Sequence, residues 1–304
     1  MPIITIFGAT GAQGGAVLEA VLADGKYTPR AVSRNVDSAA SKALIAKGIE
    51  VVPGNLSDVE SLKKAIQGSE AVFGVTNFWD PEVFPADPKG KLEITQGKNL
   101  VDAAKAVSVK FFIFSSLPNI TKETDGKFTH VYHYDNKAII EEYLKESGLP
   151  YASLLTCWFL DNLWKFGSLT KTDTGSYNIA IPKFEDTDVQ DATFTKDIGL
   201  AAVGLLTHYK DASKGVVGGA FPVVSAQFTY PELAAAIGRA LKKEVTFTSL
   251  PTGGMAEFDE MFTYQAKVRA YKDTPFPNPK LAALGVKFDS LEGFIQKEVV
   301  PRFA

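Results

Sequence analysis

The first residues of this chain couple a short apolar strand to a glycine-rich turn and then to a helix. The strand reads IITIF, the turn GATGAQGG, and the helix begins AVLEAVLA. We expect Gly8 to let the chain turn sharply, Gly11 to let a pyrophosphate approach the backbone, and Gly14 to let helix and strand pack closely. The helix would point its free N–H groups and positive dipole end at the phosphates. The segment therefore predicts a dinucleotide-binding loop, and the alternative is an ordinary tight turn.

The end of the second predicted strand indicates which dinucleotide binds. NAD sites usually carry an acidic residue there, which binds the ribose hydroxyls. Here the strand ends at Ser33 and is followed by Arg34, whose planar cation suits a 2′-phosphate. We therefore expect NADP(H). The alternative is that Arg34 is a solvated surface charge and that Asp37 supplies the missing carboxylate.

Composition limits the classes of protein to which the chain can belong. Its 304 residues, 45% hydrophobic and 22% charged, can bury a large core. The net charge of −3, without a run of Lys or Arg, argues against direct binding of nucleic acid. Three histidines and one cysteine, Cys157, offer no zinc cluster and no internal disulfide.

The N-terminus and the apolar segments bear on where the protein works. The chain enters its first strand at once, which leaves no room for a secretory leader. No uncharged run approaches the length that spans a membrane. We therefore expect a protein of the cytoplasm or the nucleus that does not bind membranes.

Strand and helix signals alternate through the first half of the chain. This alternation predicts an α/β fold, a Rossmann-type doubly wound parallel sheet at 1–156. We expect a smaller α/β C-terminal domain for substrate or partner at 157–304, with segments that return to the first domain. Residues 80–91, with three prolines, predict a mobile loop over the carboxyl ends of the strands. The expected strands are 3–7, 29–33, 50–53, 71–75, 111–115 and 151–155, and expected helices include 58–66, 94–107 and 135–146.

Polar and aromatic residues follow two of these strands. The fourth strand leads into Thr76, Asn77, Phe78 and Trp79. Asn77 could lie near the cofactor ribose and the two aromatic rings near the adenine or the substrate, although core packing explains the rings equally well. The fifth strand ends at Ser115, where a short-chain dehydrogenase holds its catalytic serine.

His133 and Lys137 lie four residues apart in the next predicted helix. Short-chain dehydrogenases use Tyr-x-x-x-Lys, in which the lysine lowers the tyrosine pKa and holds the nicotinamide ribose. Here His133 takes the tyrosine position, and Tyr132 and Tyr134 project about 100° away around the helix. We expect Lys137 to hold the ribose and His133 to supply a proton. The alternative is structural, with His133 packed at the helix start and Lys137 bonded to backbone.

Several segments together resemble the NmrA-like family of atypical short-chain dehydrogenases, which is related to isoflavone reductases. The resemblance implies an NADP(H)-binding Rossmann domain and one of two roles, NADPH-dependent reduction or redox-sensing regulation of a partner protein. The family's phosphate-loop residues match Gly8, Thr10, Gly11, Gln13 and Gly14, and its histidine and lysine match His133 and Lys137. The segments are ITIFGATGAQGGAV, SRN, GNLSD, FFIFSS, HYDNKAIIEEYLKESGLPYASLL, FTKDIGLAAVGLL and TYPELAAAIGRALKKEVTFTSLP.

Two classes of function remain open at this point. An enzyme would pass a hydride from NADPH to a carbonyl, an imine or an activated double bond of an unknown small molecule. A regulator would read the NADPH/NADP⁺ ratio and control a protein partner without turnover. The expected catalytic residues are Lys137 and His133, and the expected cofactor-binding residues are Gly8, Thr10, Gly11, Gln13, Gly14, Arg34, Asn55, Leu56, Thr76, Asn77, Phe78, Ser115 and Lys137.

Overall fold

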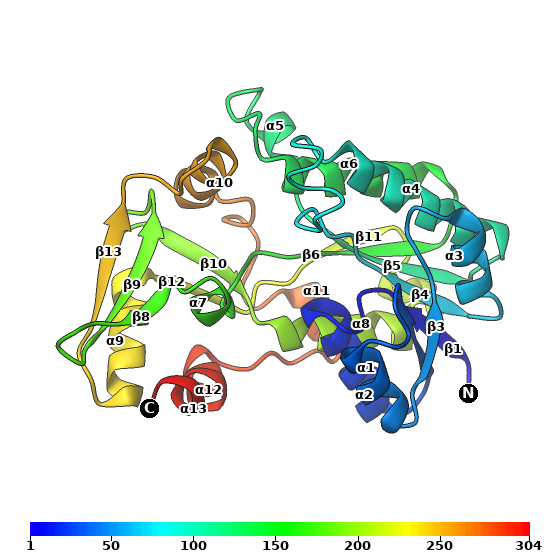
Figure 1. The fold of residues 1–304 in the computed structure, drawn as a ribbon, viewed down its shortest axis with the longest axis horizontal. Helices are drawn as coiled ribbons and strands as arrows, with labels where there is room; N and C mark the ends of the chain where they lie inside the picture. Colours follow the sequence, from blue (N-terminus) through cyan, green and yellow to red (C-terminus); the bar gives the residue numbers. More distant parts are fainter.

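The computed structural model describes residues 1–304 and contains a seven-stranded sheet and two three-stranded sheets (Figure 1). The large sheet has the order β11-β6-β5-β4-β1-β2-β3, and all neighbours in it are parallel. Six of its strands agree with the predicted ones within a residue or two. The bounds are β1 (Ile3–Ile6), β2 (Thr28–Ser33), β3 (Glu50–Pro53), β4 (Ala71–Gly74), β5 (Phe111–Ser116), β6 (Tyr151–Leu155) and β11 (Gly219–Pro222).

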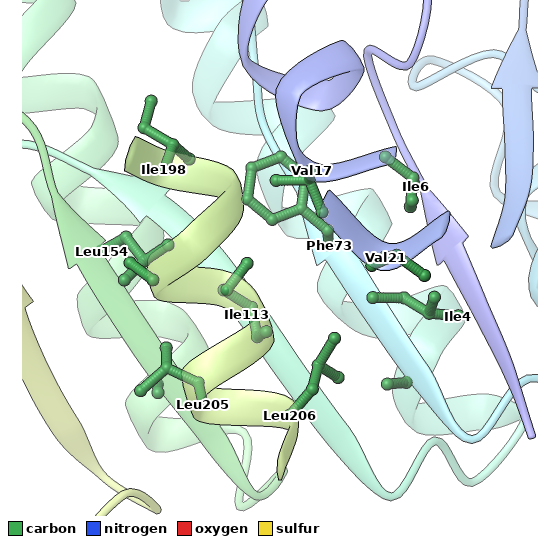
Figure 2. Close-up of a cluster of buried hydrophobic side chains, with 14 of the residues drawn as sticks. Ile4, Ile6, Val17, Val21, Phe73, Ile113, Leu154, Ile198, Leu205 and Leu206 are labelled. Carbon is green, nitrogen blue, oxygen red and sulfur yellow. The ribbon is translucent and has the colours of Figure 1, made fainter. Parts of the chain in front are cut away.

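Alternate residues of the strands face opposite sides of the sheet, and each side has its own apolar core. On one side, Ile113 and Leu154 contact a cluster that includes residues of helices α1 (Ala12–Asp24) and α8 (Thr195–His208), as Figure 2 shows. These two helices approach closely, because a Cβ on Gly199 would lie 2.2 Å from the carbonyl oxygen of Ala16. Phe112 and Phe114 face the other side and pack against α3 (Val59–Ile66), α4 (Lys91–Ala106) and α6 (Tyr132–Glu146).

The helix starts show where local sequence signals were sufficient and where they failed. The helix expected at 58–66 is α3, and its start is capped by Asp58, whose carboxylate accepts from the N–H groups of Glu60 and Ser61. The predicted start of α4 at 94 was three residues late, because Gly90, at φ 61°, already turns the chain into the helix. The start of α6 was also three residues late, because its cap comes from a distant residue described below.

The second half of the chain forms a smaller α/β part around its own core, which includes Tyr230. One sheet contains β7 (Trp158–Phe159), β10 (Val189–Thr193) and β12 (Ala226–Thr229), and the other β8 (Leu169–Lys171), β9 (Tyr177–Pro182) and β13 (Val245–Leu250). Three elements of this half lie against the large sheet: β11 is one of its strands, and α8 and α11 (Pro279–Ala283) contribute to the core that covers it. The remaining helices are α2 (Ala39–Ala46), α5 (Ile120–Glu123), α7 (Asn162–Lys165), α9 (Tyr230–Leu241), α10 (Ala256–Lys267), α12 (Leu291–Phe294) and α13 (Val300–Phe303).

Helix α10 belongs to the second half but approaches α5 and α6 of the first half in Figure 1. The apolar contact includes Met261 and Tyr264 of α10 with Ile120 and Tyr134. No helix of the chain combines the length and the apolar character that a membrane span requires.

Candidate functional site

A cavity of about 540 Å³ opens at the carboxyl ends of β1 to β4, at the point where the strand order reverses between β1 and β4. Its volume falls in the range of small-molecule sites. The lining comes from the loops after four neighbouring strands, the end of β2, the first turn of α1 and one residue of α4. The lining comprises Phe7, Gly8, Thr10, Gly11, Ala12, Gln13, Gly14, Val32, Ser33, Arg34, Asn35, Gly54, Asn55, Leu56, Val75, Thr76, Asn77, Asp80 and Gln96.

The glycine loop, residues 8–14, forms one wall of this cavity, and its glycines have different structural roles. Gly8 has φ +66°, and its carbonyl accepts from the N–H of Gly11 at 2.9 Å, which closes the turn. A Cβ on Gly14 would lie 2.4 Å from the backbone of Gly8 and Phe7, so only glycine lets α1 start so close to β1. No side chain caps the start of α1 at Gly11. The N–H groups of its first turn are therefore not occupied by a side-chain acceptor and can receive an anion.

Arg34 and Asp80 are the only charged residues in the lining, and they form an ion pair with Nη2 and Oδ2 2.8 Å apart. Arg34 projects from the end of β2, and its side chain is 56% exposed. Asp37, which we considered as the acidic partner, is not in the lining and lies 3.8 Å from Lys42 at the surface. The carboxylate beside Arg34 therefore comes from the loop after β4 and not from the loop after β2.

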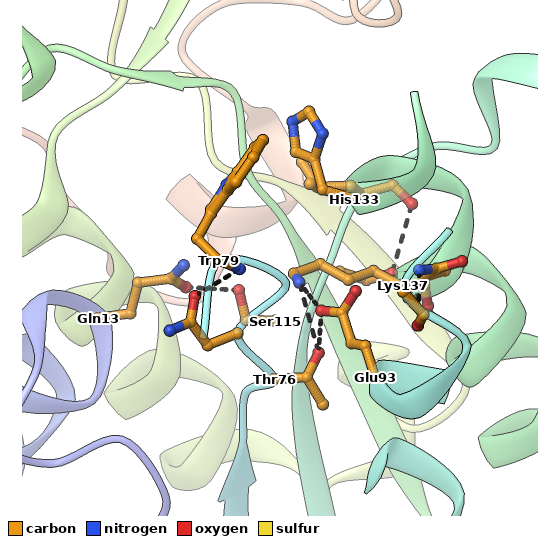
Figure 3. Close-up of polar contacts among 12 residues, drawn as sticks. Gln13, Thr76, Trp79, Glu93, Ser115, His133 and Lys137 are labelled. Atoms are coloured by element: carbon orange, nitrogen blue, oxygen red, sulfur yellow. Dashed lines mark hydrogen bonds and ion pairs between the residues drawn. The ribbon is translucent and has the colours of Figure 1, made fainter. Parts of the chain in front are cut away.

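Lys137 of α6 pairs with a carboxylate that the sequence analysis did not identify. Its Nζ contacts Glu93 of α4 and lies 3.4 Å from the hydroxyl of Thr76, which itself donates to Glu93 at 2.7 Å (Figure 3). Both charged residues are buried, and the second carboxylate oxygen of Glu93 has no hydrogen-bond partner. Thr76 joins this buried pair to the cavity, because Thr76 is part of the lining.

Ser115 ties the end of β5 to the glycine loop. Its hydroxyl donates to the side-chain oxygen of Gln13 at 2.6 Å, and its side chain is buried (Figure 3). Gln13 lines the cavity, whereas Ser115 does not. Ser115 therefore fixes the position of a lining residue.

His133 lies one helical turn before Lys137 and contacts a second unforeseen carboxylate, Glu257 of α10. Oxygens of Glu257 also accept from the N–H groups of Tyr132 and His133, at 3.1 and 3.0 Å. Glu257 thus caps α6 from the second half of the chain. This distant cap explains why α6 begins three residues before the predicted start.

Trp79 packs beside the His133 ring, with the two ring planes tilted by 50°. The two ring centroids lie 5.3 Å apart, and Trp79 also packs on Phe258 of α10 at 5.2 Å. Phe78, for which core packing was the alternative, is buried beside Trp79 and Phe84 and does not line the cavity.

Tyr134, the residue after His133, does not take over its position. The hydroxyl of Tyr134 accepts from the side-chain amide of Gln265 of α10 at 2.8 Å, and burial raises the Tyr134 pKa. Because the ring packs against α10, Tyr134 does not enter the cavity. The position that a short-chain dehydrogenase gives to tyrosine is therefore held here by the imidazole of His133.

The sequence profile of the NmrA-like family matches residues 2–282. The chain belongs to the NmrA-like family. Two relatives are oxidoreductases with an NmrA-like domain. One, notA of Aspergillus sp. (strain MF297-2), is 30% identical over 252 residues, which cover 77% of this chain and 71% of the relative. The other, lnbB of Aspergillus flavus, is 29% identical over 296 residues, or 90% of this chain and 86% of the relative.

Solved structures agree with the NmrA-like assignment at the level of the fold. The crystal structure of NmrA, described as a negative transcriptional regulator in complex with NADP, superposes with a TM-score of 0.79. The match covers 99% of this chain and 96% of the other at 19% identity. At that identity the likeness concerns the fold alone.

Within this NmrA-like fold, the expected site residues fall into two groups. Gly8, Thr10, Gly11, Gln13, Gly14, Arg34, Asn55, Leu56, Thr76 and Asn77 line one cavity. Phe78, Ser115, His133 and Lys137 lie outside that lining. Three carboxylates were missed because no local pattern marks them, Asp80 in the loop after β4, Glu93 on α4 and Glu257 on α10.

Proposed function

We propose that this chain binds NADP(H) in the cavity and reduces a carbonyl, an imine or an activated double bond of a small molecule. The observation that carries the proposal is the cavity itself. Its lining combines a glycine turn, the uncapped start of α1 and a single cation, Arg34, at the end of β2. Uncapped N–H groups suit a pyrophosphate and Arg34 suits a 2′-phosphate, so the residues present fit this cofactor. The oxidoreductase names of the relatives support the same reaction class.

We assign the cofactor-binding role mainly to residues 1–156 and the substrate or partner surface to residues 157–304, apart from α8, α11 and β11. When bound, NADPH would supply a hydride to an electron-poor atom of the substrate. Lys137 would act near the ribose through its ammonium group and the Thr76 hydroxyl. Glu93 would keep Lys137 in place and compensate its charge.

His133 is the candidate proton donor. Its Nδ1 faces Glu257, so Nε2 is the ring atom left for the substrate, and it would donate a proton there from the imidazolium form, which Glu257 would stabilise. Trp79 packs beside the ring. Glu257 acts as the positioning residue, since it touches His133 and the backbone of α6 and not the cavity.

A redox-sensing regulator is the second candidate, and one observation favours it. The usual tyrosine is absent from the position four residues before Lys137. In addition, Glu257 of α10 contacts α6, and Phe258 of α10 contacts Trp79. A change at the cofactor site would therefore reach the second half of the chain, where a protein partner could bind. A single buried cysteine suits a protein of the cytoplasm or the nucleus, where either role could operate.

Absorbance at the reduced nicotinamide band, followed with a panel of quinones, enones, aldehydes and imines, separates the two functions. Turnover of NADPH with any member supports the reductase, and Lys137→Ala should abolish it. No turnover, combined with different affinities for NADPH and NADP⁺, supports the regulator. Failure to bind either form overturns both.

A further inference from the structure

The only two charged residues that line the cavity are bound to each other. Arg34 is the single cation and Asp80 the single carboxylate, and the oxygen that faces Arg34 is 2.8 Å from its guanidinium. Asp80 is buried, whereas more than half of the Arg34 side chain is exposed. The cation that would hold a 2′-phosphate thus already has an anionic partner.

Asp80 is held in place by its own turn. Its second carboxylate oxygen accepts from the N–H of Glu82 at 3.1 Å, and its carbonyl accepts from the N–H groups of Val83 and Phe84. The oxygen that faces Arg34 therefore belongs to a hydrogen-bonded turn. A phosphate that binds Arg34 would meet this carboxylate at close range, and like charges in such a site repel each other.

We propose that Asp80 sets the discrimination between phosphorylated and unphosphorylated dinucleotides in this protein. Asp80 competes with the 2′-phosphate of NADP(H) for Arg34 and also repels that phosphate. The same carboxylate can accept hydrogen bonds from the ribose hydroxyls of NAD(H), which carries no phosphate there. Asp80 therefore lowers the preference for NADP(H) and permits NAD(H) to bind as well. This inference rests on the proposed dinucleotide-binding function.

Asp80→Asn tests the proposal because it removes the charge and keeps the side-chain oxygen that accepts from Glu82. Calorimetric titration with NADPH and with NADH gives the ratio of the two dissociation constants. We expect the ratio to shift toward NADPH by about tenfold, the size of one charge-assisted contact. Asp37→Asn is the matched control, since it removes a carboxylate three residues after Arg34 that lies outside the lining. The control should leave the ratio within about twofold.

The outcomes are distinct. If the wild-type protein binds both dinucleotides and Asp80→Asn leaves their ratio unchanged, the role of Asp80 is overturned while the proposed function stands. An equal shift of the ratio in Asp37→Asn would also overturn the role of Asp80, because the shift would then follow from the loss of any nearby negative charge. If neither dinucleotide binds the wild type, the proposed function and the inference fall together. Asp80→Ser, which also retains an acceptor for Glu82, replaces Asp80→Asn if that variant does not fold.

Discussion

Lys137 and Glu93 form an ion pair between α6 and α4 in which the lysine side chain is 9% exposed and the glutamate side chain is not exposed at all. We expect Glu93→Ala to lower the free energy of unfolding by about 3 to 5 kcal/mol, because the ammonium would stay buried without a counter-charge. Denaturant titration measures the change. The double variant Glu93→Met with Lys137→Met should lose less free energy of unfolding than Glu93→Ala. An equal or larger loss would show that the unpaired ammonium is not the cause of the destabilisation.

Arg34→Ser should weaken NADPH binding by about ten- to a hundredfold and leave NADH binding much less affected. The reason is that the variant removes the single cation of the lining and leaves Asp80 to face the 2′-phosphate alone. Lys42→Ser, a change of an exposed cation that lies outside the lining, is the control. Parallel losses for both dinucleotides in Arg34→Ser would contradict a role at the 2′-phosphate.

The glycine loop allows a prediction that separates folding from binding. Gly11→Val should abolish dinucleotide binding with little change in melting temperature, since a Cβ at Gly11 meets only the Gly8 carbonyl oxygen at 3.3 Å. Gly14→Ala should lower the melting temperature, because its Cβ would lie 2.4 Å from backbone atoms. Calorimetry and thermal unfolding of the two variants test this. Normal NADPH binding by Gly11→Val would show that the glycine loop is not part of the binding site.

The contact between His133 and Glu257 predicts a positioning effect if the protein turns over. Glu257→Gln should lower kcat more than it raises KM, because the imidazole would lose the carboxylate that fixes its ring. His133→Phe should lower the rate further, because it removes the candidate proton donor itself. Glu260→Gln is the control, since Glu260 binds the exposed His130 instead. Equal kinetics for Glu257→Gln and the wild type would refute this role.

The buried carboxyl group of Asp197, at the start of α8, should make the stability of the protein depend on pH. Burial raises its pKa to about 7, and one of its oxygens has no hydrogen-bond partner. Because the folded-state pKa lies above the unfolded one, the stability it contributes is present below about pH 4 and is lost as the pH rises toward 7. Asp197→Asn should therefore gain stability relative to the wild type over this range, by at most about 4 kcal/mol. Denaturant titrations of both proteins at pH 4, 5.5 and 7.5 measure this gain in stability. A stability difference that does not change with pH would contradict the prediction.

The large sheet could be predicted because its signals are local. Several strands of the first half, such as β1, β4 and β5, are short and mostly apolar segments, and the glycine turn after β1 marks the first crossover. The residues after each strand were therefore expected at one edge, and ten of them do line a single cavity.

The contacts that complete the site could not be predicted in the same way. Glu93 is 44 residues from Lys137, and Glu257 is 124 residues from His133. Neither acid has a neighbour in sequence that marks it, and only the packing of α4 and α10 against α6 brings it to its partner. The early start of α6 was missed for the same reason, since the acceptor for its first N–H groups lies on another helix.

β11 pairs with β6, and α8 packs against α1. These contacts limit how NmrA-like chains can be cut into fragments or joined into chimeras. A fragment that ends at residue 156 would expose the edge of β6 and the apolar face around Leu154, and such edges promote aggregation. The first half is therefore not a transferable module. A chimera that takes its substrate-facing parts from a relative should keep residues 195–222 and α11 with their own first half, because Leu281 and Leu284 belong to the same core. It should also keep Glu257, which caps α6.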